Sequence, residues 1–165
     1  RAHLIDGGVD HRLRRAAELD RVIPFLISKS LLTPSILVRA ACHGEMAVVE
    51  RALTHLAGLS PQRVRDMMKG EGILGFKGLH RKIGLPQSCY GILQAACDVS
   101  AEIDEEGVIL PSEQFGRRLI EVLMTRYESM PLPERAKHMD IIGRYAEDKV
   151  RTIARRLKAD IVRAA

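Results

Sequence analysis

The sequence predicts an all-α protein, built as a helical repeat or a compact bundle of short antiparallel helices. From Leu32 to Pro86, apolar patterns of helical length alternate with glycine and proline residues that start and stop helices. Aromatic residues make up only 4% of the chain and tryptophan is absent, so the core has to consist of Leu, Ile, Val, Ala and Met. Aliphatic, alanine-rich cores suit closely packed helices better than sheets. Short helices joined by tight turns are typical of helical repeats and bundles.

The N-terminal segment shows weaker helical signals than the rest of the chain. Residues 1–9 contain two adjacent glycines and no clear period, so we expect a frayed lead-in. Asp10 can cap a helix that extends to about Val22. Pro24 removes a backbone donor and is expected to end or kink this helix. The apolar residues 25–32 then predict a short second helix.

Two helices of the first half begin with a hydroxyl residue followed by proline. Thr33 and Ser60 each supply a capping hydroxyl, and the proline after each stands at the first helical position, where proline is best tolerated. Between them, residues 45–57 carry the strongest helical signal of this half, and a further helix is expected over 73–83, ending at Gly84. The apolar residues of 45–57 recur at three- and four-residue spacing: Met46, Val49, Ala52, Leu53 and Leu56.

The C-terminal half predicts longer helices. Residues 86–103 form one helix, residues 104–111 a loop, and Ser112 begins the next helix. After a break that contains two prolines, a single last helix is expected over 134–162. One apolar stripe follows that helix: Met139, Ile142, Ala146, Val150, Ile153, Leu157 and Ile161.

These elements predict a single domain over residues 1–165. A helical-repeat core occupies residues 10–103, and two longer helices extend it over residues 112–163. Because the chain starts at Arg1 rather than at methionine, we expect either an excised fragment or a processed product.

Composition favours a cytoplasmic protein. No signal-peptide pattern is visible, and no apolar run approaches the roughly 20 residues that span a bilayer, so we expect no membrane span. The cysteines Cys42, Cys89 and Cys97 are odd in number and lack C-x-x-C spacing. They are therefore expected to be reduced thiols that fill the core.

Three segments carry a resemblance to a known family: LLTPSILVRAACHGE (31–45), VVERALTHLAGLSPQRVRDMM (48–68) and GFKGLHRKIGLP (75–86). They resemble an alphaproteobacterial family of helical-repeat proteins defined as a conserved domain of unknown function. The resemblance implies a bacterial, cytoplasmic protein with a HEAT-like helical fold. That family has no agreed activity, so the resemblance assigns no catalytic residue.

A glycine pattern and scattered thiols and imidazoles are the motifs closest to enzyme chemistry. Residues 70–75 match G-x-G-x-x-G, but the segment before them is a predicted helix, whereas a dinucleotide site needs a strand there. A weak anion site beside Gly72 and Lys77 is the remaining alternative. Cys42 and His43 are adjacent and point about 100° apart on a helix, so they cannot easily share a metal. We therefore expect no enzyme activity, no cofactor, no catalytic residue and no metal site.

The strongest functional lead is positive charge. The net charge is +5, and from Arg144 to Arg163 seven basic residues stand against three acidic ones. A second group forms i,i+4 pairs on predicted helices of the repeat region, where stacked helices would align them into a binding surface. The candidate binding surface comprises Arg39, His43, Arg51, His55, Lys77, Arg81, Arg151, Arg155, Arg156 and Lys158.

We therefore expect a non-enzymatic interaction module or adaptor that presents a partly basic helical surface to a protein partner, for example in bacterial signalling or cell organisation. The alternative is a nucleic-acid-binding module that uses Arg151, Arg155, Arg156 and Lys158 on the last helix. Against it, no aromatic residue is interleaved with these cations for base stacking. The sequence leaves the oligomeric state and the partner open.

Overall fold

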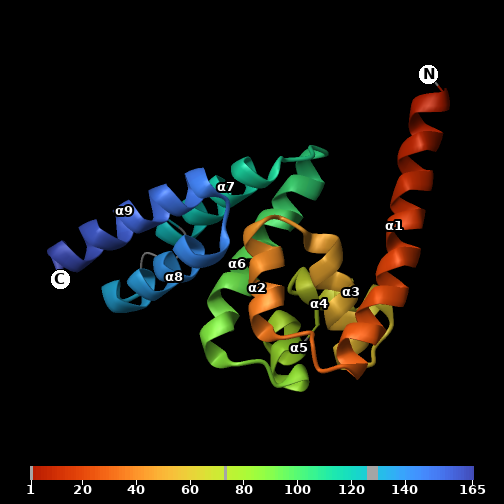
Figure 1. Ribbon diagram of the computed structural model, residues 1–165, viewed down its shortest axis with the longest axis horizontal. Helices are drawn as coiled ribbons and strands as arrows, with labels where there is room; N and C mark the ends of the chain where they lie inside the picture. The colour runs from red at the N-terminus through yellow and green to blue at the C-terminus, as the bar shows by residue number, and fades with distance from the viewer. Residues whose placement is uncertain (1, 73, 126–129) are drawn as a thin grey trace.

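Nine α-helices and no strand occur in the part of the chain that the computed structural model describes, residues 2–72, 74–125 and 130–165 (Figure 1). Side chains are described from residue 14 onward within these ranges. The prediction of an all-α protein is confirmed. The helices are α1 (Ala2–Ser28), α2 (Pro34–Cys42), α3 (Met46–Ala57), α4 (Pro61–Met68), α5 (Gly75–Ile83), α6 (Gln87–Glu106), α7 (Ser112–Thr125), α8 (Leu132–Tyr145) and α9 (Asp148–Ala164).

α1 differs from the prediction because it is one helix of 27 residues that runs through Pro24. The predicted cap at Asp10 lies inside it, and residues 2–9 are helical rather than a frayed lead-in. Asp20 and Pro24 are both exposed, so water can hydrate the carbonyl that loses its donor at the proline. Burial of Ile23 in the core, with the packing of α1 on α3, then holds the helix together across this position.

The short helices of the first half follow their sequence signals closely. Ser60 is the N-cap of α4, and its hydroxyl accepts a hydrogen bond from the Arg63 N–H at 3.3 Å. Thr33 is the N-cap of α2 and precedes a proline, as predicted, but its hydroxyl makes no capping bond. α5 begins at Gly75 rather than at residue 73, and Ile73 lies outside the described residues.

The predicted last helix over residues 134–162 is wrong as a single element, because the chain turns back between Tyr145 and Asp148. Ala146 and Glu147 have extended backbone, with ψ of 174° and 156°. Asp148 then stands in the first turn of α9, where a carboxylate is favoured by the helix dipole. The C-terminal extension is consequently three helices of 14, 14 and 17 residues, α7 to α9, rather than two longer ones.

Most of the predicted apolar stripe is buried, but on two helices that face each other. Met139 and Ile142 of α8 and Val150 of α9 are fully buried, whereas Ile153 and Leu157 of α9 are only partly buried. α8 and α9 pack along one another as an antiparallel pair (Figure 1). The folded-back stripe lets the two helices bury each other, which a single straight helix could not do.

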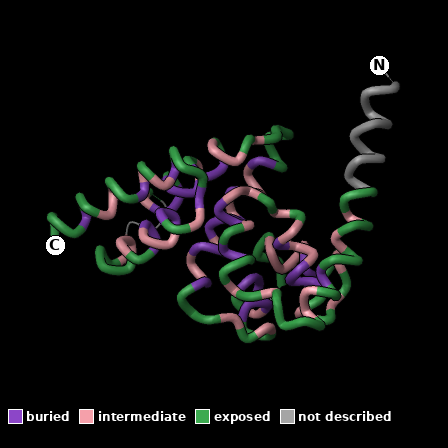
Figure 2. The backbone as a smooth tube through the Cα atoms, viewed as in Figure 1, coloured by how far each residue is buried: buried purple, intermediate pink, exposed green. Residues whose placement is uncertain are grey.

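α6 lies at the centre of the core and contacts α2, α3, α5 and α7. The buried residues form one cluster that extends from Ile23 to Ile161, and the buried segments of the tube run through the middle of the molecule (Figure 2). Two glycines allow close helix contacts. A Cβ at Gly91 of α6 would lie 2.5 Å from the His138 ring of α8, and one at Gly116 of α7 would lie 2.9 Å from Val150 of α9.

Candidate functional site

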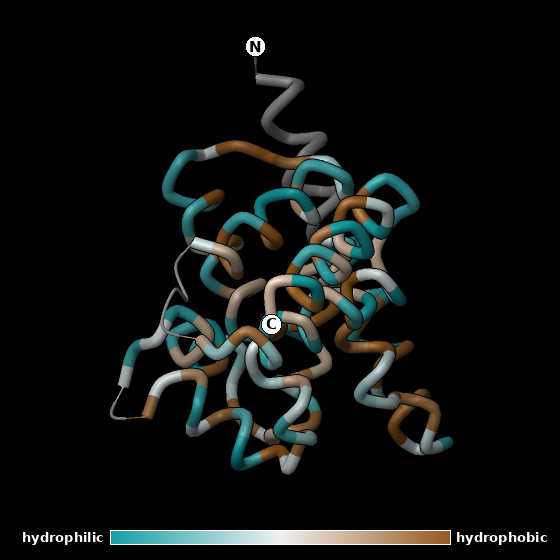
Figure 3. Tube along the Cα trace, turned by 90° about the vertical axis from the view of Figure 1, so that its left-hand side faces the viewer, coloured by the Kyte–Doolittle hydropathy of each residue, from teal (hydrophilic) through white to brown (hydrophobic). Residues whose placement is uncertain are grey.

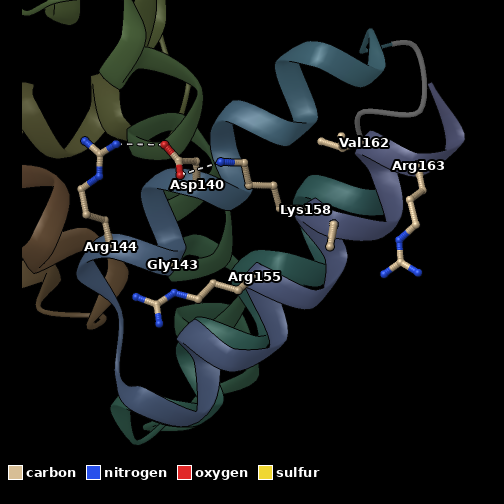
Figure 4. A pocket seen from close by; sticks show the side chains of 8 residues that line it. Asp140, Gly143, Arg144, Arg155, Lys158, Val162 and Arg163 are labelled. Carbon is tan, nitrogen blue, oxygen red and sulfur yellow. Dashed lines mark hydrogen bonds and ion pairs between the residues drawn. The ribbon is translucent and has the colours of Figure 1, made fainter.

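A groove of about 590 Å³ lies between α8 and α9 on the side away from the core (Figure 4). Residues three or four apart share one face of a helix, and this spacing brings each helix's contribution to the same side. α8 supplies Asp140, Gly143 and Arg144. α9 supplies Arg155, Lys158, Ala159, Val162 and Arg163.

Gly143 makes room for an arginine side chain in this groove. A Cβ built at this position would lie 3.2 Å from Cγ of Arg155, so the bare backbone of α8 accepts the arginine stem. The stem lies toward α8, as Figure 4 shows, while the guanidinium remains outside the core because Arg155 is exposed. A long side chain packed along its stem in this way keeps its charge in solvent.

Positive charge exceeds negative charge in the groove, since four cations and one carboxylate line it. Asp140 accepts hydrogen bonds from Lys158 Nζ and from Arg144 Nη2, both at 2.9 Å. The Lys158 hydrogen bond is the main reason why the pKa of Asp140 is lowered, with the Arg144 charge adding to it. Arg155 forms no hydrogen bond or ion pair with any other described residue. Its charge is therefore available to a ligand.

The groove also has an apolar component. Val162 is 60% exposed although it is a large aliphatic residue, and Ala159 is exposed beside it. The arrangement combines free positive charge with accessible apolar surface over a short length of α9. It is suited to a ligand that carries both a carboxylate or phosphate and an apolar group.

Of the four α9 residues predicted from sequence, Arg155 and Lys158 line this groove. Arg156 is exposed but does not line it, as expected for the neighbour of Arg155 about 100° further round the helix. Arg151 forms an ion pair with Asp148 at 3.1 Å. It lines a second depression instead.

That second depression joins the two predicted groups of basic residues. Arg39 of α2 and His43, the residue that caps the C-terminus of α2, line it together with Arg151 of α9. Arg144 borders both this depression and the groove. Glu113, Glu147 and Asp148 balance much of the positive charge there.

His43 has a structural function in this depression. Its Nε2–H donates to the Tyr145 carbonyl at 2.8 Å, which leaves Nδ1 to accept from the Ser112 hydroxyl at 3.3 Å. The ring thereby connects α2 to the end of α8 and the start of α7.

The other predicted binding residues lie elsewhere. Arg51 and His55 of α3 both contact Asp20 of α1, at 3.5 and 3.3 Å, and so hold α1 against α3. Arg81 is exposed on α5. Lys77 lines a small hollow with Tyr90, Asp98 and the glycines of residues 70–75.

The glycine pattern of residues 70–75 follows α4 and leads into α5, with no strand before it. Its three glycines all have positive φ, 83° at Gly70, 91° at Gly72 and 50° at Gly75. The pattern therefore serves a turn between two helices.

Sequence reasoning missed Asp140, Gly143, Ala159 and Val162 of the groove, and it counted Arg144 and Arg163 only as part of the basic C-terminal segment, not of the candidate surface. Their i,i+3 and i,i+4 spacing was visible in the sequence. It forms a groove only because the chain folds back at residues 146–147 and places α8 beside α9. The signal for that turn was the acidic pair Glu147–Asp148, which is typical of a helix start.

The three buried thiols are poorly suited to act as nucleophiles. Burial raises the pKa of Cys42 and of Cys97 to about 12 and also raises the pKa of Cys89. All three thiols are therefore protonated at neutral pH, whereas the thiolate is the reactive form. Within the described ranges, no group of three or more His, Cys, Asp or Glu residues is placed to hold a metal ion.

Acid is expected to destabilise the fold through His138. This side chain is 5% exposed, and neither ring nitrogen has a hydrogen-bond partner among the described residues. Burial lowers its pKa, so the folded state disfavours the proton that the unfolded state accepts near pH 6.5. The stabilisation is present above about pH 6.5 and is lost as pH falls below it.

Urea unfolding at several pH values between about 7.5 and 5 tests this dependence. We expect the free energy of unfolding to decrease as the pH is lowered. This decrease should be smaller in His138→Leu than in the natural chain. His80, which is also buried with a lowered pKa, accounts for part of the remaining loss. Equal pH dependence in His138→Leu and the natural chain would contradict the assignment to His138.

Comparison with known proteins identifies a family but no function. A family model described as an uncharacterised protein conserved in bacteria (DUF2336) matches residues 2–133. No curated protein and no solved structure matches the chain. None of the helices in the described ranges is both long and apolar enough to cross a membrane. The match ends at residue 133, so the residues that line the groove between α8 and α9 lie outside the matched segment. Because the model covers more than half of the chain, the protein belongs to this family of bacterial conserved domains.

Proposed function

We propose that this chain is a non-enzymatic interaction module or adaptor of the bacterial cytoplasm, and that its α8–α9 groove binds an acidic segment of a protein partner. The remaining helices form the rigid support of the groove. The proposal includes the HEAT-like repeat character and the alphaproteobacterial origin that the sequence resemblance implies, and a role in signalling or cell organisation.

The observation that supports this function is the combination of charges and apolar surface in the groove. Arg155 has no partner among the described residues, and Lys158 and Arg144 share a single carboxylate. Charge-assisted hydrogen bonds from these donors to Asp or Glu side chains would orient a bound segment. Val162 and Ala159 offer contact to an apolar side chain of the same segment.

A protein ligand fits this groove better than nucleic acid does. No aromatic side chain lines it, so unpaired bases would find no stacking surface. Arg151 is paired with a carboxylate, and Arg156 lies outside the groove. Nucleic-acid binding through Arg151, Arg155, Arg156 and Lys158 is the less favoured alternative, and the test below distinguishes it from peptide binding.

The test is fluorescence anisotropy with a labelled peptide that carries Glu and Leu at helical three- and four-residue spacing, at about 50 and 200 mM salt. The groove variant Arg155→Glu/Lys158→Gln is expected to weaken binding at least about tenfold, since it removes two charged donors. The matched variant Arg156→Glu/Lys137→Gln changes charge equally on exposed residues outside the groove. It is expected to bind as the natural chain does.

Two results would overturn the proposal. Peptide binding that both variants weaken equally would show a general charge effect rather than a groove. Binding of a labelled DNA duplex that is tighter than peptide binding, falls steeply with salt and is lost in the Arg156 variant would favour the nucleic-acid module.

A further inference from the structure

The connection between α6 and α7 has the chemical character that the groove requires in a ligand. Asp104 and Glu105 stand in the last turn of α6, and Val108 and Ile109 follow the glycine that ends this helix. Val108 is 44% exposed and Ile109 is 83% exposed, more than any other large apolar residue among the described side chains. We call residues 104–110 the α6–α7 corner. In Figure 3 its apolar part is the brown stretch at the top of the trace.

The acidic residues of the corner do not stabilise their own helix. Carboxylates at a helix C-terminus face the negative end of the dipole, and no basic residue stands in this last turn. Neither Asp104 nor Glu105 forms an ion pair with a described residue, whereas Glu106 is paired with Arg118 at 2.8 Å. Two uncompensated carboxylates and an exposed isoleucine therefore lie within six residues of each other.

From the pairing of these two surfaces, we propose that the groove between α8 and α9 binds the α6–α7 corner of a second copy of this chain. The inference rests on the proposed function of the groove and names its occupant. Glu105 and Asp104 would accept hydrogen bonds from Arg155 and Lys158. Ile109 would cover Val162 and Ala159, which removes apolar surface from water on both copies.

The dimensions of the two surfaces are compatible. Arg155 and Val162 are seven residues apart on α9, which corresponds to about 10 Å along the helix axis. Glu105 lies in the last helical turn of α6 and Ile109 lies two residues beyond Gly107, so only a short stretch of chain, at most about 13 Å if it were fully extended, separates them. One corner can therefore reach both the charged and the apolar part of the groove.

The two surfaces lie in different parts of the molecule, so the contact joins separate copies. In Figure 1, α9 ends at the far left, whereas the α6–α7 connection lies at the top centre. A contact between unlike surfaces is heterologous and builds a ring or an open chain of copies. The net charge of +5 opposes association at long range, but at about 0.15 M salt this repulsion is screened beyond roughly 8 Å.

Sedimentation velocity over a range of concentrations tests the proposal with two complementary variants. The groove variant is Arg155→Glu/Lys158→Gln, and the corner variant is Glu105→Lys/Ile109→Ser. The natural chain is expected to sediment faster as concentration rises, while each variant alone remains a monomer. An equimolar mixture of the variants is expected to form a complex of two chains and no larger species, because only one intact pair of surfaces remains.

Matched controls change the same charges elsewhere. Arg21→Glu/Lys137→Gln and Glu71→Lys alter exposed residues outside both surfaces and are expected to associate as the natural chain does. Circular dichroism checks that each variant is folded, and the altered residues all lie at the surface or at the rim of the groove.

The outcomes separate this inference from the proposed function. A natural chain that stays monomeric at every concentration, or a variant mixture that forms no complex, would overturn head-to-tail association. If the groove still binds the Glu–Leu peptide in that case, the proposed protein-binding function stands. The segment that occupies the groove would then belong to another protein and not to a second copy of this chain. Association that persists in the groove variant would place the contact elsewhere and also overturn the inference.

Discussion

Replacing Gly44 with alanine is expected to lower the free energy of unfolding by about 2–5 kcal/mol, for two independent reasons. Gly44 forms the turn between α2 and α3 with φ of +73°, a conformation that costs a residue with a Cβ about 1–2 kcal/mol. The new Cβ would also lie 2.7 Å from Cγ of Phe115, a buried residue of α7. Relieving that overlap has to move a core side chain, which costs typically about 1–3 kcal/mol.

Gly58→Ala is the matched control for this prediction. Gly58 ends α3 with φ of +64°, so alanine meets the same backbone penalty, but nothing lies within 4 Å of its Cβ. Urea unfolding of the two variants should therefore differ by the cost of displacing Phe115. Equal losses would show that Phe115 moves aside freely and that the turn is not held tightly against α7.

Sequence signals were sufficient where structure is decided locally. Ser60, Gly58 and Gly84 end or begin helices because of their own backbone and hydrogen-bonding preferences, and the structure places them at those positions. The helix over residues 45–57 was equally clear because its apolar residues repeat with the helical period.

Long-range packing decided the elements that the sequence did not predict. α1 continues through Pro24 because Ile23 packs into the core and Asp20 contacts Arg51 and His55, and no local pattern reports these contacts. The turn at residues 146–147 was hidden because one apolar stripe serves two antiparallel helices as well as it serves a single long helix.

The sequence predicted one wall of the candidate site but not the other. Basic residues on α9 were evident from composition, and Arg155 and Lys158 do line the groove. The opposite wall, with Asp140 and Gly143, exists only because α8 folds back along α9. A pattern within one helix cannot report which residues a neighbouring helix brings to it, so the exposed charge was predictable and the groove was not.

Gly91→Ala is expected to be the second strongly destabilising change. It is informative because the same substitution in a helix interior usually stabilises a protein. In a helix interior, alanine is normally favoured over glycine by roughly 0.5–1 kcal/mol. Here the new Cβ would lie 2.5 Å from Cε1 and 2.7 Å from Nε2 of His138, so this buried ring has to move within the packed core. We expect a net loss of about 2–3 kcal/mol in the free energy of unfolding.

Gly143→Ala and a double-mutant cycle isolate the cause of this loss. Gly143 is also inside a helix, but its Cβ would meet only the flexible Arg155 side chain at 3.2 Å, so this change should be neutral or stabilising by up to about 1 kcal/mol. Combining Gly91→Ala with His138→Ala should cost at least about 1 kcal/mol less than the two single changes together, because the smaller residue at 138 removes the overlap. Additive losses would mean that the cost at residue 91 arises within α6 itself.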